Sequence, residues 1–283
     1  MSNWFLPEDS IAACQQKSPL DALETRMLLS HVGGLSRVQL ITQSELQLTV
    51  AQIAELNNLL QRRVDGEPLA YLIGEREFYG LDFTVSPAVL IPRPDTELLV
   101  ELALQHSPQN ASLLDMGTGS GAIAISIAAQ RQDIQVCACD ISTDALTIAK
   151  INADRHLVNR SAISFYESDW YQQIPQQQFH TIVSNPPYIV KDDEHLSQGD
   201  LRFEPINALT DHADGLSAFR KIIADAPNYL ARDGWLLMEH GYHQSQEVQA
   251  LLRERGFDQI QSWQDLAGIW RVTGGIWMND GNK

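Results

Sequence analysis

The spacing of hydrophobic residues changes along this chain, and its first part has the period of a helix. After Ser44, apolar side chains recur every three or four positions, at Leu46, Val50, Ile53, Leu56 and Leu60. This pattern indicates an amphipathic helix capped by Ser44. Two further helices are expected near residues 7–16 and 20–32. Residues 1–75 are therefore predicted to form a small helical domain.

A period of two replaces the helical period after residue 75. Apolar and polar side chains alternate from Leu81 to Val85, and Gly80 separates this run from an aromatic pair, Phe78 and Tyr79. The pattern predicts a β-hairpin within residues 76–92 that joins two domains. Pro94 follows and can open a helix, because proline is tolerated in a first turn.

From about residue 111 onward, apolar runs alternate with helical patterns. Strands are predicted at residues 112–116, 134–139, 163–166, 179–184, 235–239, 257–263 and 270–277, and helices at residues 122–130 and 143–156. Such alternation is typical of an α/β fold with a mostly parallel sheet and helices on both faces. A Rossmann-like domain over residues 93–283 is the prediction.

Composition narrows the classes of function. The chain has 283 residues and a formal net charge of -16, which disfavours non-specific binding to nucleic acid. It opens without a basic segment followed by an apolar one, and no window approaches the roughly 20 apolar residues of a membrane span. We expect a cytoplasmic protein. Cys14, Cys137 and Cys139 form no disulfide framework, and the pair His240 and His243 lacks further ligands, so no metal site is predicted.

A glycine-rich loop follows the first strand of the predicted sheet. Gly117, Gly119 and Gly121 stand where the backbone of an α/β protein approaches a ligand and a helix begins. By itself this loop fits a nicotinamide site or a purely structural connection equally well. The third glycine, however, comes one position earlier than in the nicotinamide pattern, and Asp115 precedes the loop.

The acids at the ends of two strands favour a cofactor that carries a positive charge. A carboxylate at Asp115 would repel a pyrophosphate but suits the ammonium group of S-adenosylmethionine, and Asp140 can accept hydrogen bonds from both ribose hydroxyls. Thr118 and Ser120 complete the predicted cofactor loop. Another nucleotide, or a fold that has lost its ligand, remains the alternative.

A third strand end offers Asp169 and Trp170. A polar side chain there can bond the adenine amino group, and an aromatic one can cover the ring. A surface loop with a packed tryptophan explains the same residues.

The sequence Asn185-Pro186-Pro187-Tyr188, after the fourth strand, suits a flat NH2 group. Such a nitrogen has a delocalised lone pair, so it must be held and polarised before it accepts a methyl group. The side-chain oxygen of Asn185 and the carbonyl of Pro186 can each accept one of its hydrogens, and the ring of Tyr188 can pack on its face. The prolines stiffen the segment and remove competing donors. Asn185 is also expected to face the cofactor, although a simple turn with an aromatic anchor is the alternative for this segment.

With these motifs, the chain resembles the peptide chain release factor glutamine methyltransferases over nearly its whole length. The resemblance includes further segments: Tyr71-Leu72-Ile73-Gly74, Glu77-Phe78-Tyr79-Gly80, Ile91 to Glu97, Phe203-Glu204-Pro205, Asp214-Gly215-Leu216, Glu239-His240-Gly241 and Asp265-Leu266-Ala267-Gly268. Ile91 to Glu97, together with a helical N-terminal domain, is the most specific part.

The resemblance implies an activity and a partner. Members of this family use S-adenosylmethionine to methylate the side-chain amide nitrogen of the glutamine in a Gly-Gly-Gln motif. It implies that the N-terminal helices help to hold the release factor, that the residues from Gly117 to Gly121, Asp140 and Trp170 bind cofactor, and that residues 185–188 bind the glutamine amide. Arg93, Thr96 and Glu97 are expected to shape the substrate pocket.

Three other functions fit parts of the sequence. A DNA methyltransferase also presents a flat amino group to such a loop, but residues 76–283 hold 15 basic and 27 acidic side chains and no large basic insertion. The glutamine of a ribosomal protein is another possible acceptor. A non-catalytic module that binds translation factors is the rival of a different class, against which the intact glycines and Asn185 argue.

Overall fold

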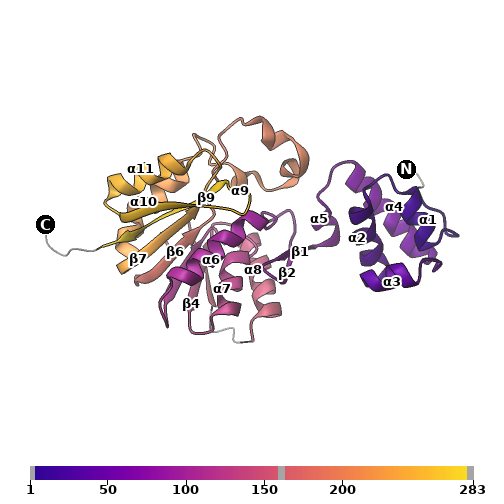
Figure 1. Ribbon diagram of the computed structural model, residues 1–283, viewed down its shortest axis with the longest axis horizontal. Coiled ribbons are helices and arrows are strands. Elements are labelled where there is room, and N and C mark those ends of the chain that lie inside the picture. Colours follow the sequence, from indigo (N-terminus) through magenta and orange to yellow (C-terminus); the bar gives the residue numbers. More distant parts are fainter. Residues whose placement is uncertain (1–3, 159–162, 279–283) are drawn as a thin grey trace. The chain divides into compact units, whose positions relative to one another are not determined.

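The chain forms two compact units in the computed structural model, which describes residues 4–158 and 163–278 (Figure 1). The first unit ends at Gly74 and the second begins at Glu75. The opening residues 1–3, considered above for a targeting signal, lie outside the described part. Within that part, no helix has both the length and the apolar character of a membrane span.

Short helices build the first unit around one apolar core. They are α1 (Ile11–Lys17), α2 (Ala22–Gly33), α3 (Arg37–Thr42), α4 (Val50–Val64) and α5 (Leu69–Ile73). Leu28 and Leu29 of α2 pack with Leu56 and Leu60 of α4, all almost completely buried. The helices expected near residues 7–16 and 20–32 are therefore present. Helices α3 and α5 are too short to show a helical period, and the sequence pattern did not indicate them.

The longest of these helices begins later than the hydrophobic period suggested. Thr49, not Ser44, caps α4, because Thr49 and Gln52 form a reciprocal capping box. The backbone amide of Thr49 donates to Gln52 Oε1 at 2.9 Å, and the amide of Gln52 donates to Thr49 Oγ1 at 3.3 Å. Leu46 therefore lies before the helix, although its spacing matches the helical face.

A mostly parallel sheet organises the second unit, as the sequence predicted. Among the described residues its seven strands have the order β5-β4-β3-β6-β7-β9-β8, and β9 alone is antiparallel to its neighbours on both sides. The strands are β3 (Ser112–Met116), β4 (Gln135–Asp140), β5 (Ile163–Glu167), β6 (Phe179–Ser184), β7 (Leu230–Glu239), β8 (Asp258–Gln264) and β9 (Trp270–Trp277).

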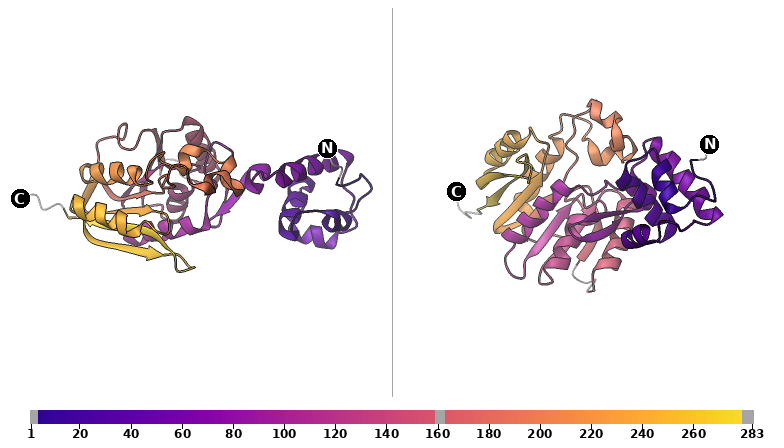
Figure 2. Two further views of the ribbon diagram at one scale, coloured as in Figure 1. Left: turned by 90° about the horizontal axis from the view of Figure 1, so that it is seen from above. Right: turned by 45° about the vertical axis from the view of Figure 1, so that its right-hand side comes forward.

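Helices cover both faces of this sheet (Figure 2). On one face lie α6 (Glu97–His106), α7 (Ala122–Gln130) and α8 (Thr143–His156), and on the other lie α10 (Ser217–Tyr229) and α11 (Ser245–Arg255). Neighbouring strand residues alternate between the two cores, so that Val183 packs with the first set of helices and Ile182 with the second. The unit also contains η1 (Pro94–Thr96), η3 (Glu194–Ser197), η4 (Gly199–Phe203) and α9 (Ile206–Leu209).

A β-hairpin, formed by β1 (Glu75–Phe78) and β2 (Leu81–Thr84), packs within the same unit as the sheet. Asn152 of α8 binds it: the amide of Thr84 donates to Asn152 Oδ1 at 2.7 Å, and Asn152 Nδ2 donates to the carbonyl of Thr84 at 3.0 Å. The same Nδ2 donates to the carbonyl of Ser120 at 2.9 Å. One buried side chain thus joins the hairpin to the glycine loop.

Candidate active site

The carboxyl ends of five parallel strands meet at one edge of the sheet, where β3 has β4 on one side and β6 on the other. Crossovers that leave in opposite directions open a crevice at such a point. A cavity of about 450 Å³ lies there, and its wall includes residues that follow β3, β4, β5 and β6 together with segments within 88–90 and 205–221. The predicted cofactor and acceptor motifs therefore belong to one site.

The glycine loop is held close to β4 by its own backbone. The amides of Gly117 and Thr118 both donate to the carbonyl of Cys139 at 2.9 Å. Gly117 and Gly119 line the cavity with φ of +72° and +56°, and a Cβ at Gly119 would meet nothing within 4 Å. A Cβ at Gly121 would lie 2.6 Å from Ile125 Cδ1, so this glycine permits helix packing instead.

Asp115 lies beneath the loop and does not line the cavity. Its carboxylate accepts a hydrogen bond from Thr118 Oγ1 at 2.6 Å, and burial raises the pKa of Asp115 to about 7. Thr118 and Ser120 are also buried away from the cavity wall. Among the described residues, Asp115 Oδ1 is buried without a hydrogen-bond partner, and the contact expected between Asp115 and a cofactor ammonium stays a prediction.

Both carboxylate oxygens of Asp140 accept hydrogen bonds from backbone amides. Asp140 Oδ2 accepts the amide of Gly119 and Oδ1 accepts the amide of Ser142, both at 2.9 Å. Burial raises the pKa of Asp140, and these amides favour its charged form. The amide of Ile141 also lowers this pKa, so the backbone uses much of the acceptor capacity of the Asp140 carboxylate.

Ile141 is a site residue that sequence reasoning missed. It lines the cavity and is 68% exposed. An apolar side chain beside Asp140 suits a flat ring next to a hydroxylated group. Its position directly after a strand-ending acid was the available signal.

Asp169 and Trp170 reach the same cavity after β5. The amide of Ser168 donates to the carbonyl of Asp140 at 3.0 Å, and Ser168 Oγ donates to the carbonyl of Trp170 at 2.7 Å. The indole ring lies 4.0 Å from the position of a Cβ at Gly117. Trp170 therefore lies against the glycine loop and also packs on one of the two cores of the sheet, so its contact with adenine stays a prediction.

The acceptor motif begins directly after β6, and Asn185 and Pro187 line the cavity. Asn185 Nδ2 donates to Thr96 Oγ1 at 3.2 Å, which directs the amide nitrogen away from a ligand and leaves the Oδ1 acceptor for it. Pro186 is buried and Tyr188 half-buried, and neither lines the cavity. The four residues are thus contiguous, but only two of them form its wall.

Glu239, at the end of β7, connects these groups beneath the surface. It is 2% exposed, and burial raises its pKa to about 7 against hydrogen bonds from Thr96 and Asn185 and the charge of Arg271. Tyr188 Oη lies 3.5 Å from Glu239 Oε1. Sequence analysis quoted Glu239 only within a motif and gave it no role.

The buried carboxyl of Glu239 predicts a pH-dependent stability. Its folded pKa of about 7 exceeds its ordinary value of 4.5, so its contribution is full below pH 4.5 and is lost as pH rises through 7. In urea titrations without cofactor at pH 8, the free energy of unfolding of Glu239→Gln should exceed that of wild type by about 1 to 3 kcal/mol. At pH 5 the two proteins should agree closely. Asp115 is present in both and cancels, and a variant less stable than wild type at pH 8 would contradict this assignment.

Arg93 and Glu97 lie next to the site without lining the cavity. Arg93 forms an ion pair with the buried Glu204, whose other oxygen accepts the amide of Ile91 at 3.0 Å. Glu97 Oε1 accepts the amide of Tyr79 at 3.0 Å. These contacts fix the segment that carries Thr96, and a direct substrate contact for Arg93 and Glu97 stays a prediction.

The residues considered for metal or redox chemistry have structural surroundings. The ring nitrogens of His240 are hydrogen-bonded to the carbonyl of Gly241 and to Thr273 Oγ1, both at 2.8 Å. Cys14, Cys137 and Cys139 are buried, and burial raises the pKa of each thiol.

Comparisons with known proteins agree with this geometry. Residues 10–74 match the family model of the PrmC N-terminal domain, and residues 94–200 match that of the methyltransferase small domain. A release factor glutamine methyltransferase of Burkholderia pseudomallei is 52% identical over 264 residues, which cover 91% of this chain and 93% of that protein. One from Escherichia coli is 44% identical over 259 residues, which cover 91% and 93%. The crystal structure of a methyltransferase from Pyrococcus furiosus, 16% identical, has the same fold with a TM-score of 0.54 over 77% of this chain and 97% of that one.

Proposed function

Since this chain belongs to the family of release factor glutamine methyltransferases, we propose that it methylates the side-chain amide nitrogen of the glutamine in the Gly-Gly-Gln motif of release factors. It is an enzyme of the S-adenosylmethionine-dependent class. The observation that supports the finer proposal is the Asn185 amide, which Thr96 holds with its oxygen free beside a cavity of cofactor size. The proposal concerns the exact acceptor atom and the part each residue plays.

The residues of the cavity fit S-adenosylmethionine. Gly117 and Gly119 admit close approach of its amino acid part, and the Asp140 carboxylate in the cavity wall suits the ribose hydroxyls. Ile141 and Trp170 offer apolar surface to adenine. Asp169 lines the same cavity and can accept a hydrogen bond from the adenine amino group. When bound, the cofactor supplies a methyl group activated by a sulfonium sulfur.

The acceptor loop orients the glutamine amide for this transfer. The Asn185 oxygen and the Pro186 carbonyl each accept a hydrogen bond from one N–H of the substrate amide. The ring of Tyr188 packs on the flat face of that amide. Each hydrogen bond contributes on the order of 1 kcal/mol, whereas holding the reacting atoms in line contributes about 7 to 11 kcal/mol. Positioning therefore dominates, and the nitrogen can release its proton to water once it carries the methyl group.

The two compact units suggest a division of labour. We propose that the helical domain, predicted as residues 1–75, holds the release factor, and that residues 93–283 perform the chemistry, with the hairpin of residues 76–92 between them. The match of residues 10–74 to a dedicated N-terminal family model supports this proposal.

A direct labelling experiment tests the proposed function. Purified protein is incubated with methyl-labelled S-adenosylmethionine and a release factor, beside a release factor whose motif glutamine is replaced. We expect label on that glutamine alone, located by mass spectrometry. Label that persists on the substituted release factor would overturn the proposed acceptor.

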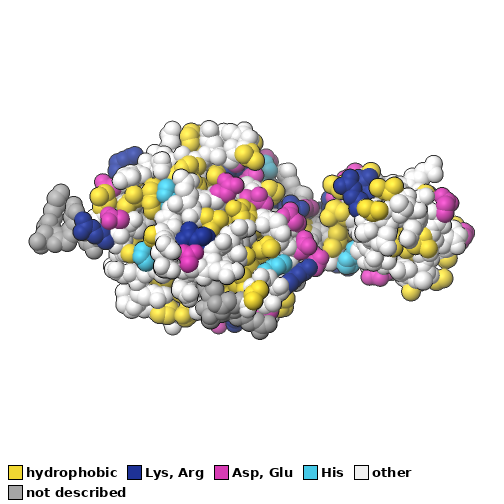
Figure 3. Space-filling model, turned by 60° about the horizontal axis from the view of Figure 1, so that its bottom comes forward, with side chains coloured by type: hydrophobic (Ala, Val, Ile, Leu, Met, Phe, Trp, Pro, Cys, Tyr) yellow, Lys and Arg dark blue, Asp and Glu magenta, His cyan; other side chains and the backbone are white. Residues whose placement is uncertain are grey.

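The DNA-methylating alternative is disfavoured by charge. On the face shown in Figure 3, Lys and Arg side chains stand apart from one another with acidic side chains among them. Affinity for a phosphate backbone comes from several clustered cations, and the net charge of -16 opposes it. A ribosomal protein glutamine remains a second acceptor for the same labelling assay.

A further inference from the structure

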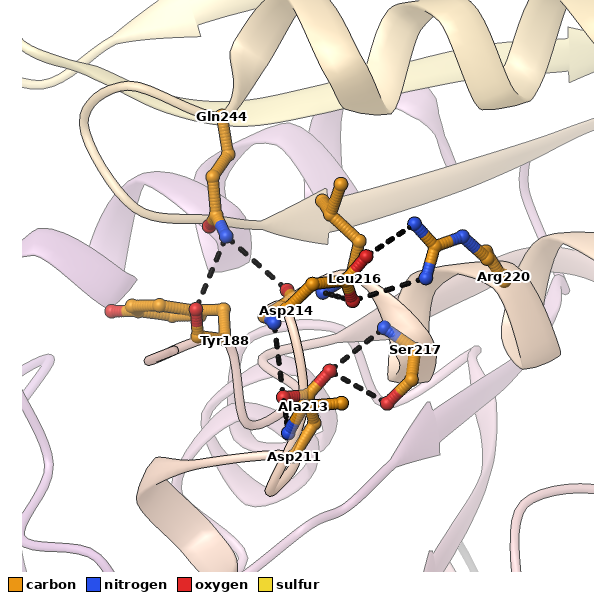
Figure 4. A network of polar contacts seen from close by, with 9 residues as sticks. Tyr188, Asp211, Ala213, Asp214, Leu216, Ser217, Arg220 and Gln244 are labelled. Atoms are coloured by element: carbon orange, nitrogen blue, oxygen red, sulfur yellow. Dashed lines mark hydrogen bonds and ion pairs between the residues drawn. The ribbon is translucent and has the colours of Figure 1, made fainter. Parts of the chain in front are cut away.

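One buried glutamine ties the acceptor loop to two other loops. Gln244 Nε2 donates to the carbonyl of Tyr188 at 3.1 Å and to the carbonyl of Gly215 at 3.2 Å, and its Oε1 accepts the amide of Gly241 at 2.9 Å (Figure 4). The side chain is 3% exposed and precedes α11. All of its strong hydrogen-bonding groups are thereby used within the protein.

The contact at Gly215 leaves no room for a larger residue. Gly215 has a φ of +76°, and a Cβ there would lie 2.5 Å from the carbonyl oxygen of Tyr188 and 2.9 Å from Gln244 Nε2. The backbone of Gly215 therefore packs directly on the end of the acceptor motif. This close packing is an observation separate from the hydrogen bonds, and it likewise joins Gly215, Tyr188 and Gln244.

The loop that carries Gly215 is itself held firmly. Asp211 accepts hydrogen bonds from the amides of Ala213, Gly215 and Ser217 and from Ser217 Oγ, at 2.6 to 3.0 Å (Figure 4). Asp214 forms a bidentate pair with Arg220 at 2.6 and 3.0 Å. The loop that carries Gly215 is thus anchored to α10. Its hydrogen bond with Gln244 therefore gives the acceptor loop a fixed attachment.

Tyr188 is held at two points, to the last residue of β7 and to the segment that follows it. Its hydroxyl lies near Glu239, and its carbonyl accepts from Gln244, five residues further along the chain. Just beyond, the amide of Ile189 donates to the carbonyl of Leu209 at 2.9 Å. The hydrogen bond from Gln244 is, among the described residues, the only one that a side-chain amide donates from this segment to the main chain of residues 185–189. Without Gln244 this link is lost.

We propose that Gln244 is a positioning residue: it fixes the backbone of the acceptor loop at Tyr188 and so sets where the Asn185 and Pro186 oxygens meet the substrate amide. This inference rests on the proposed function, because the acceptor loop is taken to bind glutamine. Gln244 is 3% exposed and does not line the cavity. Its effect therefore falls on alignment, and release factor binding depends on other contacts.

Three variants separate positioning from general stability. Gln244→Met keeps the length of the side chain and removes all three hydrogen bonds, and Gln244→Glu keeps the acceptor but loses the amide donor. Gln249→Met is the matched control, because Gln249 lies on the helix that follows Gln244 and donates instead to Ser262 Oγ at 2.8 Å. We expect Gln244→Met to lower kcat about 10- to 100-fold with KM for the release factor changed less than about threefold. Gln249→Met should retain wild-type kcat.

The charged variant gives a signature that a structural role alone would not give. At high pH the new carboxylate faces two carbonyl oxygens without a proton to donate. As pH falls it becomes protonated, and one oxygen can again donate to a carbonyl, so activity relative to wild type should rise toward low pH. A ratio to wild type that stays constant between pH 6 and 9 would overturn the proposal.

Hydrogen exchange supplies a readout that needs no turnover. The amide of Ile189 should exchange faster in Gln244→Met than in wild type or in Gln249→Met. Unchanged exchange together with unchanged kcat would refute the positioning role, as would equal losses in Gln244→Met and Gln249→Met. If Gln244→Met fails to fold, the pH ratio of Gln244→Glu decides. A wild-type protein that labels no glutamine would refute the proposed function, while the exchange data would still test the junction.

Discussion

Replacement of Asn185 by alanine is expected to lower kcat for release factor methylation about 100- to 1000-fold. Asn185 lines the cavity and its amide nitrogen donates to Thr96 Oγ1, so its oxygen is the side-chain acceptor proposed for the glutamine NH2. Loss of one preorganised polar group in a water-poor site removes stabilisation that only the transition state uses fully. Initial rates at saturating cofactor and release factor measure the effect.

Thr96→Val provides the graded comparison for this prediction. It keeps Asn185 but removes the hydroxyl that orients its amide, so we expect a smaller loss of about tenfold. The double variant should be little worse than Asn185→Ala alone, because Thr96 acts through Asn185. Turnover of Asn185→Ala within a few-fold of wild type would remove Asn185 from the proposed mechanism.

Replacement of Asp140 by alanine is expected to raise the dissociation constant for S-adenosylmethionine at least about 100-fold. Each hydrogen bond to a charged group contributes about 1.5 to 3 kcal/mol, and Asp140 is proposed to accept two from the ribose. The variant also frees the amides of Gly119 and Ser142, which the carboxylate now holds at 2.9 Å. Isothermal titration calorimetry measures the change directly.

Asp144→Ala is the matched control for cofactor binding. Asp144 lies four residues further along, in the first turn of α8, is exposed and does not line the cavity. The same charge is removed, but the dissociation constant should stay near that of wild type. Equal weakening by both variants would mean that net charge, and no specific contact of Asp140, governs affinity.

Local sequence was sufficient for the central strands because these are buried on both faces. Most residues of Ser112–Met116 and Phe179–Ser184 are buried, and the structure has strands with the same bounds as the sequence predicted. The cofactor loop was equally visible, since Gly117 and Gly119 must take positive φ where a strand turns into a helix. Local patterns failed at short helices, where a single turn shows no period, and at α4, where a capping box overrode the apolar face.

The sequence by itself determined the α/β fold, the glycine loop and the acceptor motif, because each depends on neighbouring residues along the chain. Only the tertiary structure decided which side chains serve them. Asn185 meets Thr96 across 89 positions, and Gln244 reaches Tyr188 across 56. Strand order and helix packing create such contacts, and spacing along the chain carries no record of them.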